Sequence, residues 1–236
     1  MNSTAHKCGG VALASIATLV FSVHNHVSIE QGIMLVTGAT FGALLPDIDH
    51  KGSEVGKKLK PISKIICENT EHRGFTHTFV CAFIVSMFLI GVVGITKSFY
   101  HESLISRLIL GGISGFLIWI ALDTALNSMR PKFVHNKKIK KLLDLEYPSL
   151  IILIGICTIF SSRVYDSLDM FAWGATIGYI SHIILDLFNP MGVPIFYPIS
   201  KHRVHIANIK TGAQEGIVSA VCNVVTVFVL VELFIL

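Results

Sequence analysis

The feature that most constrains this chain is a series of seven apolar stretches separated by polar segments. The stretches cover about residues 9–24, 32–46, 76–96, 104–126, 148–161, 170–188 and 216–236. A stretch of ~20 apolar residues is long enough to cross the hydrocarbon core of a bilayer as a helix, and the shorter stretches need tilt or burial among neighbours. The sequence therefore predicts an all-α fold, a polytopic transmembrane helical bundle with about seven spans.

Composition excludes several other classes of protein. Only 14% of the 236 residues are charged, against roughly 25% in an average soluble domain. A soluble enzyme, a disordered chain and a nucleic-acid-binding domain all need more charge, so no nucleic acid is expected as a partner despite the net charge of +4. The five cysteines form no CxxC pair, which argues against a disulfide framework and a cysteine zinc site.

Positive charge is distributed very unequally between the two sides of the predicted bundle. Sixteen of the 19 lysine and arginine residues fall on one side, chiefly in the loops at about 47–75, 127–147 and 189–215. Cytoplasmic loops of membrane proteins collect lysine and arginine, so this side is predicted to be cytoplasmic. The N-terminus then lies in the cytoplasm, and we expect a multi-pass protein of the bacterial plasma (inner) membrane.

Acidic and imidazole side chains gather where three spans meet this cytoplasmic side. The segments concerned are Leu45–His50, His72–His77 and Ser181–Asp186. Ionisable residues inside or at the edge of a membrane are costly unless they face the bundle interior or a wet cavity. The three segments are therefore expected to converge on one site.

The spacing within these segments indicates metal ligands. His182 and Asp186 are four residues apart in an expected helix, so they share one face. Asp47 and Asp49 follow Pro46, which indicates a turn; in an extended turn both would point the same way, with His50 adjacent. Carboxylates combined with imidazoles are a mixed oxygen and nitrogen ligand set, suited to a divalent Zn, Mn or Fe ion.

Each element has a plainer interpretation when it stands alone. An Asp-x-Asp at a membrane edge is usually solvated loop charge, and a His/Asp pair near a helix end can form a structural hydrogen bond. His72 or His77 alone would be unremarkable, and a lone arginine such as Arg73 is most often an interface anchor. The joint occurrence of all these residues on one face is what predicts a metal site.

At these residues the sequence resembles the bacterial membrane-bound, metal-dependent hydrolase family of the YdjM type. The resemblance rests on the three segments above, on Asn189–Pro194 and on the early histidine His6, and it covers most of the chain. It implies a polytopic inner-membrane protein with a single integral domain over residues 1–236. The stretch 97–169 separates the second and third segments by more chain than a minimal member would have, so it is interpreted as an insertion.

Taken together, the residues and the resemblance suggest metal-assisted hydrolysis. Asp47, Asp49, His50, His77, His182 and Asp186 are the candidate ligands of one metal ion or a pair, with His6 as a weaker candidate. A bound metal would generate a nucleophile from water, with a surplus carboxylate or His72 as general base or acid. Arg73 is suited to hold an anionic group. An amphiphilic phosphoester or ester, such as an anionic membrane lipid, is the expected substrate.

Two alternatives use the same residues without catalysis. The first is a transporter in which the His/Asp cluster coordinates a permeating ion or proton. The second is a membrane scaffold in which a metal joins three helix ends while basic loops, especially Lys137–Lys141, bind anionic lipid. Only the hydrolase would turn over a substrate, so a measurement of hydrolysis distinguishes it from both alternatives.

Overall fold

The structure, a computed structural model, describes residues 2–24, 27–101, 103–129, 146–209 and 212–235, and within these ranges it contains helices and no strand. The elements are α1 (Ser3–His24), α2 (Ile29–Gly42), η1 (Leu45–Asp49), α3 (Glu54–Lys58), α4 (Lys60–Asn69), η2 (Phe75–His77), α5 (Phe79–Ser98), α6 (Leu104–Met129), α8 (Glu146–Ile159), α9 (Ser161–Leu187) and α10 (Ala213–Ile235). The predicted all-α fold is confirmed.

The helices that are long enough to span a membrane lie where the apolar stretches of the sequence predict them. Six helices among the described residues are long and apolar enough to cross a membrane, and a shorter apolar helix occupies Pro148–Ile159, where the fifth span was expected. The second of these spans runs from Ile29 to Asp49 and so includes both α2 and η1. The basic segment Lys137–Lys141 of the predicted 127–147 loop lies outside the described residues.

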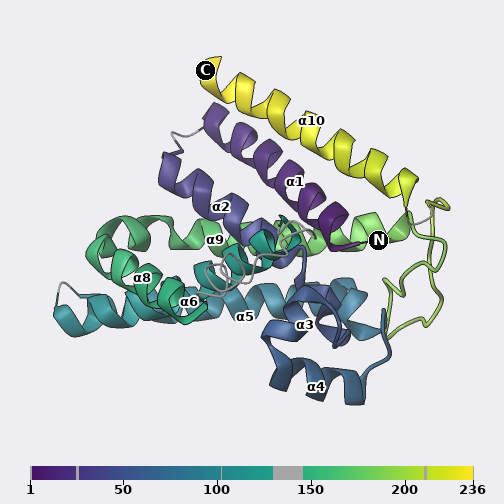
Figure 1. The fold of residues 1–236 in the computed structure, drawn as a ribbon, viewed down its shortest axis with the longest axis horizontal. Coiled ribbons are helices and arrows are strands. Elements are labelled where there is room, and N and C mark those ends of the chain that lie inside the picture. The colour runs from purple at the N-terminus through teal and green to yellow at the C-terminus, as the bar shows by residue number, and fades with distance from the viewer. Residues whose placement is uncertain (1, 25–26, 102, 130–145, 210–211, 236) are drawn as a thin grey trace, which may run out of the picture.

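The long helices lie side by side, with α1 between α2 and α10 (Figure 1). Helix α10 rests mainly on α1, and most of its apolar side chains, such as Val224 and Phe228, are exposed. Exposed apolar side chains on this scale are unfavourable in water and match the acyl chains of a bilayer.

The largest helix–helix interface of the described chain is between α2 and α9, and it depends on glycine. Gly38 and Gly42 on α2 face Gly174 and Gly178 on α9. A Cβ atom added at Gly42 would overlap the carbonyl oxygen of Ala175, and one at Gly178 would overlap that of Ala39. Small residues four apart let two membrane helices bring their backbones together, and this approach sets the end of α9 against the end of α2.

The start of α1 is fixed to two other elements. Lys7 forms a buried ion pair with Glu54 of α3, in which Nζ and Oε2 are 2.7 Å apart. The backbone N–H of Asn2 donates to the carboxylate of Glu215, a buried residue in the first turn of α10. These contacts hold the first turn of α1, which carries His6, beside the end of α9.

Candidate metal centre

Five side chains from α1, η1, η2 and α9 meet where these elements end. They are His6, Asp47, His77, His182 and Asp186. They form two groups that share His182: one contains His6 and Asp186, the other Asp47 and His77, and within each group the ligand atoms lie within 4.8 Å of one another. All but Asp47 are at most 1% exposed. Imidazole nitrogen and carboxylate oxygen are the ligand types of Zn, Mn and Fe.

His182 is oriented by the backbone of α2. Its Nδ1 lies 2.7 Å from the carbonyl oxygen of Ala43, and because a carbonyl only accepts hydrogen bonds, Nδ1 must carry the proton. In the neutral ring the lone pair is then on Nε2, which is 3.2 Å from Nε2 of His77. A backbone acceptor that fixes the tautomer of a histidine is a typical support for a metal ligand.

His77 is oriented in the same way by side chains. Its Nδ1 lies 3.0 Å from the hydroxyl oxygen of Thr76, and that hydroxyl donates to Oδ2 of Asp49 at 2.6 Å. The Nε2 atom faces the cluster, 3.5 Å from Oδ2 of Asp186 and 3.7 Å from Oδ1 of Asp47. Burial lowers the pKa of His77, but the three neighbouring aspartate carboxylates outweigh it and raise this pKa to about 9.

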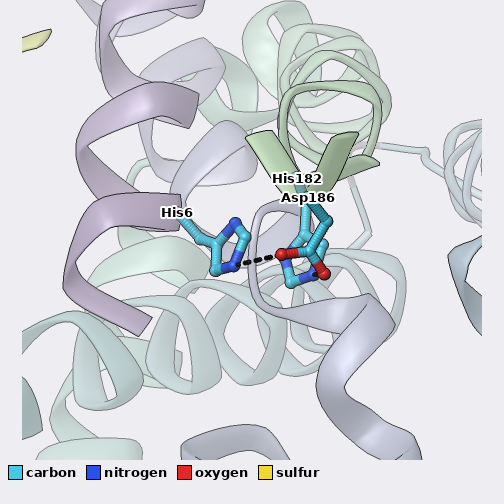
Figure 2. Close-up of side chains that lie close together, drawn as sticks. All are labelled: His6, His182 and Asp186. Atoms are coloured by element: carbon cyan, nitrogen blue, oxygen red, sulfur yellow. Dashed lines mark ion pairs between the residues drawn. The ribbon is translucent and has the colours of Figure 1, made fainter. Parts of the chain in front are cut away.

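His6 projects from α1 toward Asp186, as Figure 2 shows. Its Nε2 is 3.5 Å from Oδ1 of Asp186, and its Nδ1 has no hydrogen-bond partner among the described residues. The rings of His6 and His182 are stacked, with centroids 3.6 Å apart and planes 11° apart. Imidazole lone pairs lie in the ring plane, so these two parallel rings do not point at one position.

The Asp186 carboxylate therefore has a different histidine partner on each oxygen. Oδ1 faces His6, whereas Oδ2 is 3.6 Å from Nε2 of His182 and 3.5 Å from Nε2 of His77. The two donor groups on either side of His182 could hold one divalent ion or two.

The expectation that Asp47 and Asp49 point the same way is wrong. Leu45–Asp49 form a 3₁₀ helix rather than an extended turn, and with three residues per turn the side chains at i and i+2 diverge by a third of a turn. Asp47 consequently faces the Nε2 atoms of His77 and His182. Asp49 faces the opposite side of His77 and accepts hydrogen bonds that fix the surrounding loop, so it lies outside the two ligand groups.

His50 also lies outside these groups. It follows the 3₁₀ helix in an extended conformation, and its exposed ring lies 5.2 Å from that of His72, between ring centroids. His72 is paired with Asp49, since its Nδ1 lies 2.9 Å from Oδ1, and its side chain is 46% exposed. The structure thus separates the predicted residues into a buried cluster and an exposed His50–His72 edge.

Arg73 has a backbone conformation unusual for a residue with a side chain, with φ at +57°. L-residues enter this left-handed region at a cost of on the order of 1 kcal/mol. The conformation aims the Arg73 N–H at Oδ2 of Asp49, 2.9 Å away. The largely buried guanidinium has its Nε 3.6 Å from Oδ2 of Asp186.

Sequence reasoning missed the supporting residues. Thr76 links His77 to Asp49, and the hydroxyl of buried Tyr179 donates to the Thr76 carbonyl at 2.5 Å. Thr76 stands inside the His72–His77 segment and could have been singled out there. The Ala43 carbonyl and Tyr179 carry no comparable signal, because their roles depend on how α2 and α9 pack.

A polar pocket of about 420 Å³ opens beside the cluster. Asp47 and Arg73 line it, and His50, Glu54, Lys57 and His72 are also in its wall. The buried donors therefore have an approach from outside the bundle, lined by charged side chains of both signs and by two histidines.

Comparison with known proteins gives a consistent relationship. The profile of a family described as "YdjM inner membrane protein" matches residues 1–133 and 147–235. An "Uncharacterized protein YvsG" of Bacillus subtilis (strain 168) is 30% identical over 118 residues, which is 50% of this chain and 65% of the relative. An "Inner membrane protein YdjM" of Escherichia coli (strain K12) is 42% identical over 78 residues, which is 31% of this chain and 40% of the relative.

These pairwise matches thus span less than two thirds of each relative's length. No solved structure matches the chain significantly.

Proposed function

The chain belongs to the YdjM family of inner membrane proteins, and from the residues it gathers at one membrane face we propose that it is a metal-dependent hydrolase. The proposed centre lies at the cytoplasmic face. Its proposed substrate is an amphiphilic phosphoester or ester, such as an anionic lipid. The observation that carries the proposal is the convergence of three imidazoles and two carboxylates beside an open polar pocket that Arg73 lines.

The buried donor set fits a divalent ion of the Zn, Mn or Fe class. Buried carboxylates and imidazoles are costly to desolvate unless they are paired or bind a cation. The tautomer of His182 is fixed by Ala43, and Nδ1 of His77 is held by the Thr76–Asp49 pair, so both Nε2 atoms face one position. We assign His77, His182, Asp47 and Asp186 as the residues that would hold the ion. His6, which faces Oδ1 of Asp186, is a further candidate.

A divalent metal bound there supplies a Lewis acid that polarises the ester and lowers the pKa of water. The protein must then hold and move protons. In hydrolysis, the oxygen of water bonds to phosphorus or carbon, the bond to the leaving alcohol oxygen breaks, and the proton lost by water passes to that alcohol. We assign this proton transfer to His72, because Asp49 binds its Nδ1 and leaves Nε2 to accept and return the proton.

Arg73 has the role of binding the anionic part of the substrate. Its guanidinium lies between the cluster and the pocket, so it can reach an oxygen of a phosphate or carboxylate there while it stays near Asp186. Lys57 and Glu54 line the same pocket. A substrate with its anionic headgroup in the pocket and its chains in the bilayer fits this arrangement.

The location of the cluster favours hydrolysis over transport. The five donors stand at helix ends beside a pocket that opens on one side, whereas a transported ion needs a site reachable from both sides, commonly near the middle of the membrane. A scaffold whose metal only joins helices would have no need for an open approach to the donors or for the Asp49–His72 pair.

The test is turnover by the purified full-length chain in detergent. Bound metal is measured by mass spectrometry, and hydrolysis of phosphoester and ester lipids is measured before and after chelation. The proposal expects stoichiometric metal and hydrolysis that is lost with chelator and restored by metal. Stoichiometric metal without hydrolysis of any of these lipids would support the scaffold instead.

The position of the centre is tested by topology. A reporter fused after His205 should be cytoplasmic, and an external position would remove the site from the proposed face.

A further inference from the structure

A second pocket of about 250 Å³ lies on the other side of the segment that carries His72 and Arg73. One wall is formed by the end of α4 and the following loop, including Glu71 and Phe75. The opposite wall belongs to the loop between α9 and α10 and includes Tyr197, Lys201 and Arg203. None of the proposed metal ligands lines it.

Its positive charge is not neutralised by an ion pair. Among the residues that the structure describes, neither Lys201 nor Arg203 forms an ion pair with a carboxylate, and Glu71 is the one acidic residue in the wall. Two cations and one carboxylate leave a net charge of about +1. That charge matches a phosphodiester, which carries one negative charge, better than a phosphate monoester, which carries nearly two. Glu71 can accept hydrogen bonds from the hydroxyl groups of a headgroup.

Large apolar side chains stand next to these cations on the same loop. Ile199 is 93% exposed and Phe196 is 58% exposed, both within seven residues of Arg203. The loop joins two membrane-spanning helices, so it lies where the bilayer surface begins. Apolar side chains beside basic ones are typical of a segment that inserts into acyl chains while its cations contact lipid phosphates.

The loop is held in place. Val193 and Val204 exchange two backbone hydrogen bonds of 3.0 and 3.1 Å, and the N–H of Ile206 donates to the carbonyl of Leu187 at 2.7 Å. The ring of Tyr197 meets Phe75 edge-on, with centroids 6.3 Å apart. The cations therefore belong to a structured wall rather than to a free tail.

We propose that this pocket binds the phosphodiester headgroup of an anionic phospholipid, with Lys201 and Arg203 on the phosphate and with Ile199 and Phe196 in the acyl layer. The site is separate from the metal centre and needs no catalysis. It would anchor the end of α9, which carries His182 and Asp186, at the membrane surface.

The experiment measures lipid binding to the full chain in an uncharged detergent by native mass spectrometry. The probes are dioctanoyl phosphatidylglycerol, dioctanoyl phosphatidylcholine and the soluble headgroup glycerophosphoglycerol. We expect phosphatidylglycerol to bind more tightly than phosphatidylcholine. The double variant Lys201→Gln/Arg203→Gln should lose about fivefold in phosphatidylglycerol affinity per charge removed. The matched control is Lys60→Gln/Lys64→Gln on exposed α4 positions, which should change this affinity little.

Two further variants separate the contribution of the headgroup to lipid binding from that of the acyl chains. Glu71→Gln should strengthen phosphatidylglycerol binding, and Ile199→Ser should weaken it without affecting glycerophosphoglycerol. Thermal unfolding in the same detergent checks that each variant is folded, and if the double variant is unfolded, Lys201→Gln alone provides the test. An unchanged lipid preference in the folded variants overturns the proposal, and so does tight binding of the soluble headgroup without its lipid chains.

Discussion

The two halves of the bundle treat charge in opposite ways. At the candidate metal centre, Asp186, His77 and His182 are at most 1% exposed and face one another. In the stretch 97–169, charged residues instead form isolated pairs, such as Lys97 with Asp169 and Asp123 with Lys58 of α3, and the buried core there is apolar, with Leu110 and Leu168 fully covered. Isolated pairs such as Lys7 with Glu54 are also buried elsewhere, but at the centre several carboxylates and imidazoles share one space, which a bound cation would stabilise.

This contrast indicates which part of the chain carries function. Among its described residues, the stretch 97–169 contributes none to the two ligand groups. One of its described contacts to an element beside the site is the ion pair between Asp123 and Lys58 of α3, with Oδ2 and Nζ 2.9 Å apart. The described part of the stretch therefore supports an element beside the site, and its interpretation as an insertion stays a prediction.

The sharpest test of the contrast compares two aspartates on α9. We expect Asp186→Asn to remove most of the bound metal and to lower hydrolysis by roughly 10³-fold, because the amide keeps the shape but loses the charge that the cation needs. Asp169→Asn, on the same helix, should keep both metal and activity. Metal analysis and turnover measure the difference.

The ligand set should also act as a unit. Adding His182→Ala to Asp186→Asn should cost little more than either change alone, because the metal is already lost. If the two effects instead add while metal is retained, the cluster is a set of ordinary helix-end contacts.

A second comparison concerns proton transfer. His72→Gln should leave bound metal unchanged and lower hydrolysis by about 10²-fold, since positioned acid–base catalysis contributes on the order of 10²–10⁴. The matched change in the other half is His101→Gln, at an exposed position, and it should have no effect. Equal activity of the two variants would show that Asp49 and His72 form only a structural pair.

The α2–α9 crossing supplies a comparison of stability. Gly178→Ala places a Cβ against the α2 backbone and should destabilise the fold by roughly 1–3 kcal/mol, as overpacking does. Gly155→Ala on α8 meets open space and should stabilise its helix by up to about 1 kcal/mol. Thermal unfolding in detergent should show opposite shifts. Similar shifts would mean that the crossing is not tightly packed.

The sequence predicted the spans and the convergence because both depend on patterns of residue type. The lengths of the apolar stretches located the helices, and the shared face of His182 and Asp186 follows from their helical spacing. The direction of Asp49 could not be predicted, because it depends on whether five residues after Pro46 form a 3₁₀ helix or an extended turn. The GxxxG pairs, Gly38 with Gly42 and Gly174 with Gly178, were readable in the sequence, but which helices they join depends on tertiary packing.

The pH dependence of metal binding tests the assignment of His77 as a metal ligand. The carboxylates of Asp47, Asp49 and Asp186 raise the pKa of His77 to about 9, so its ring is protonated at neutral pH in the metal-free protein. A metal must displace that proton, so metal affinity should rise by about tenfold per pH unit toward pH 9 and then level off. Titration with metal between pH 7 and 10 measures this slope. His77→Gln should reduce it, and a wild-type affinity independent of pH would contradict the assignment.

The smallest expected effect belongs to Arg73→Lys, and it decides what the arginine is for. Lysine keeps the charge near Asp186 but loses the planar fork that binds two oxygens of one anion. If Arg73 binds substrate, the variant should retain metal and lose about tenfold in turnover or in affinity for an anionic lipid, by analogy with the loss of one charge-assisted contact. If Arg73 is instead a structural counter-ion for Asp186, lysine should lower thermal stability or metal content, because its ammonium cannot take the place of Nε, 3.6 Å from Oδ2. Arg163→Lys, at an exposed ion pair with Glu30, is the matched change far from the centre and should leave all three measurements unchanged.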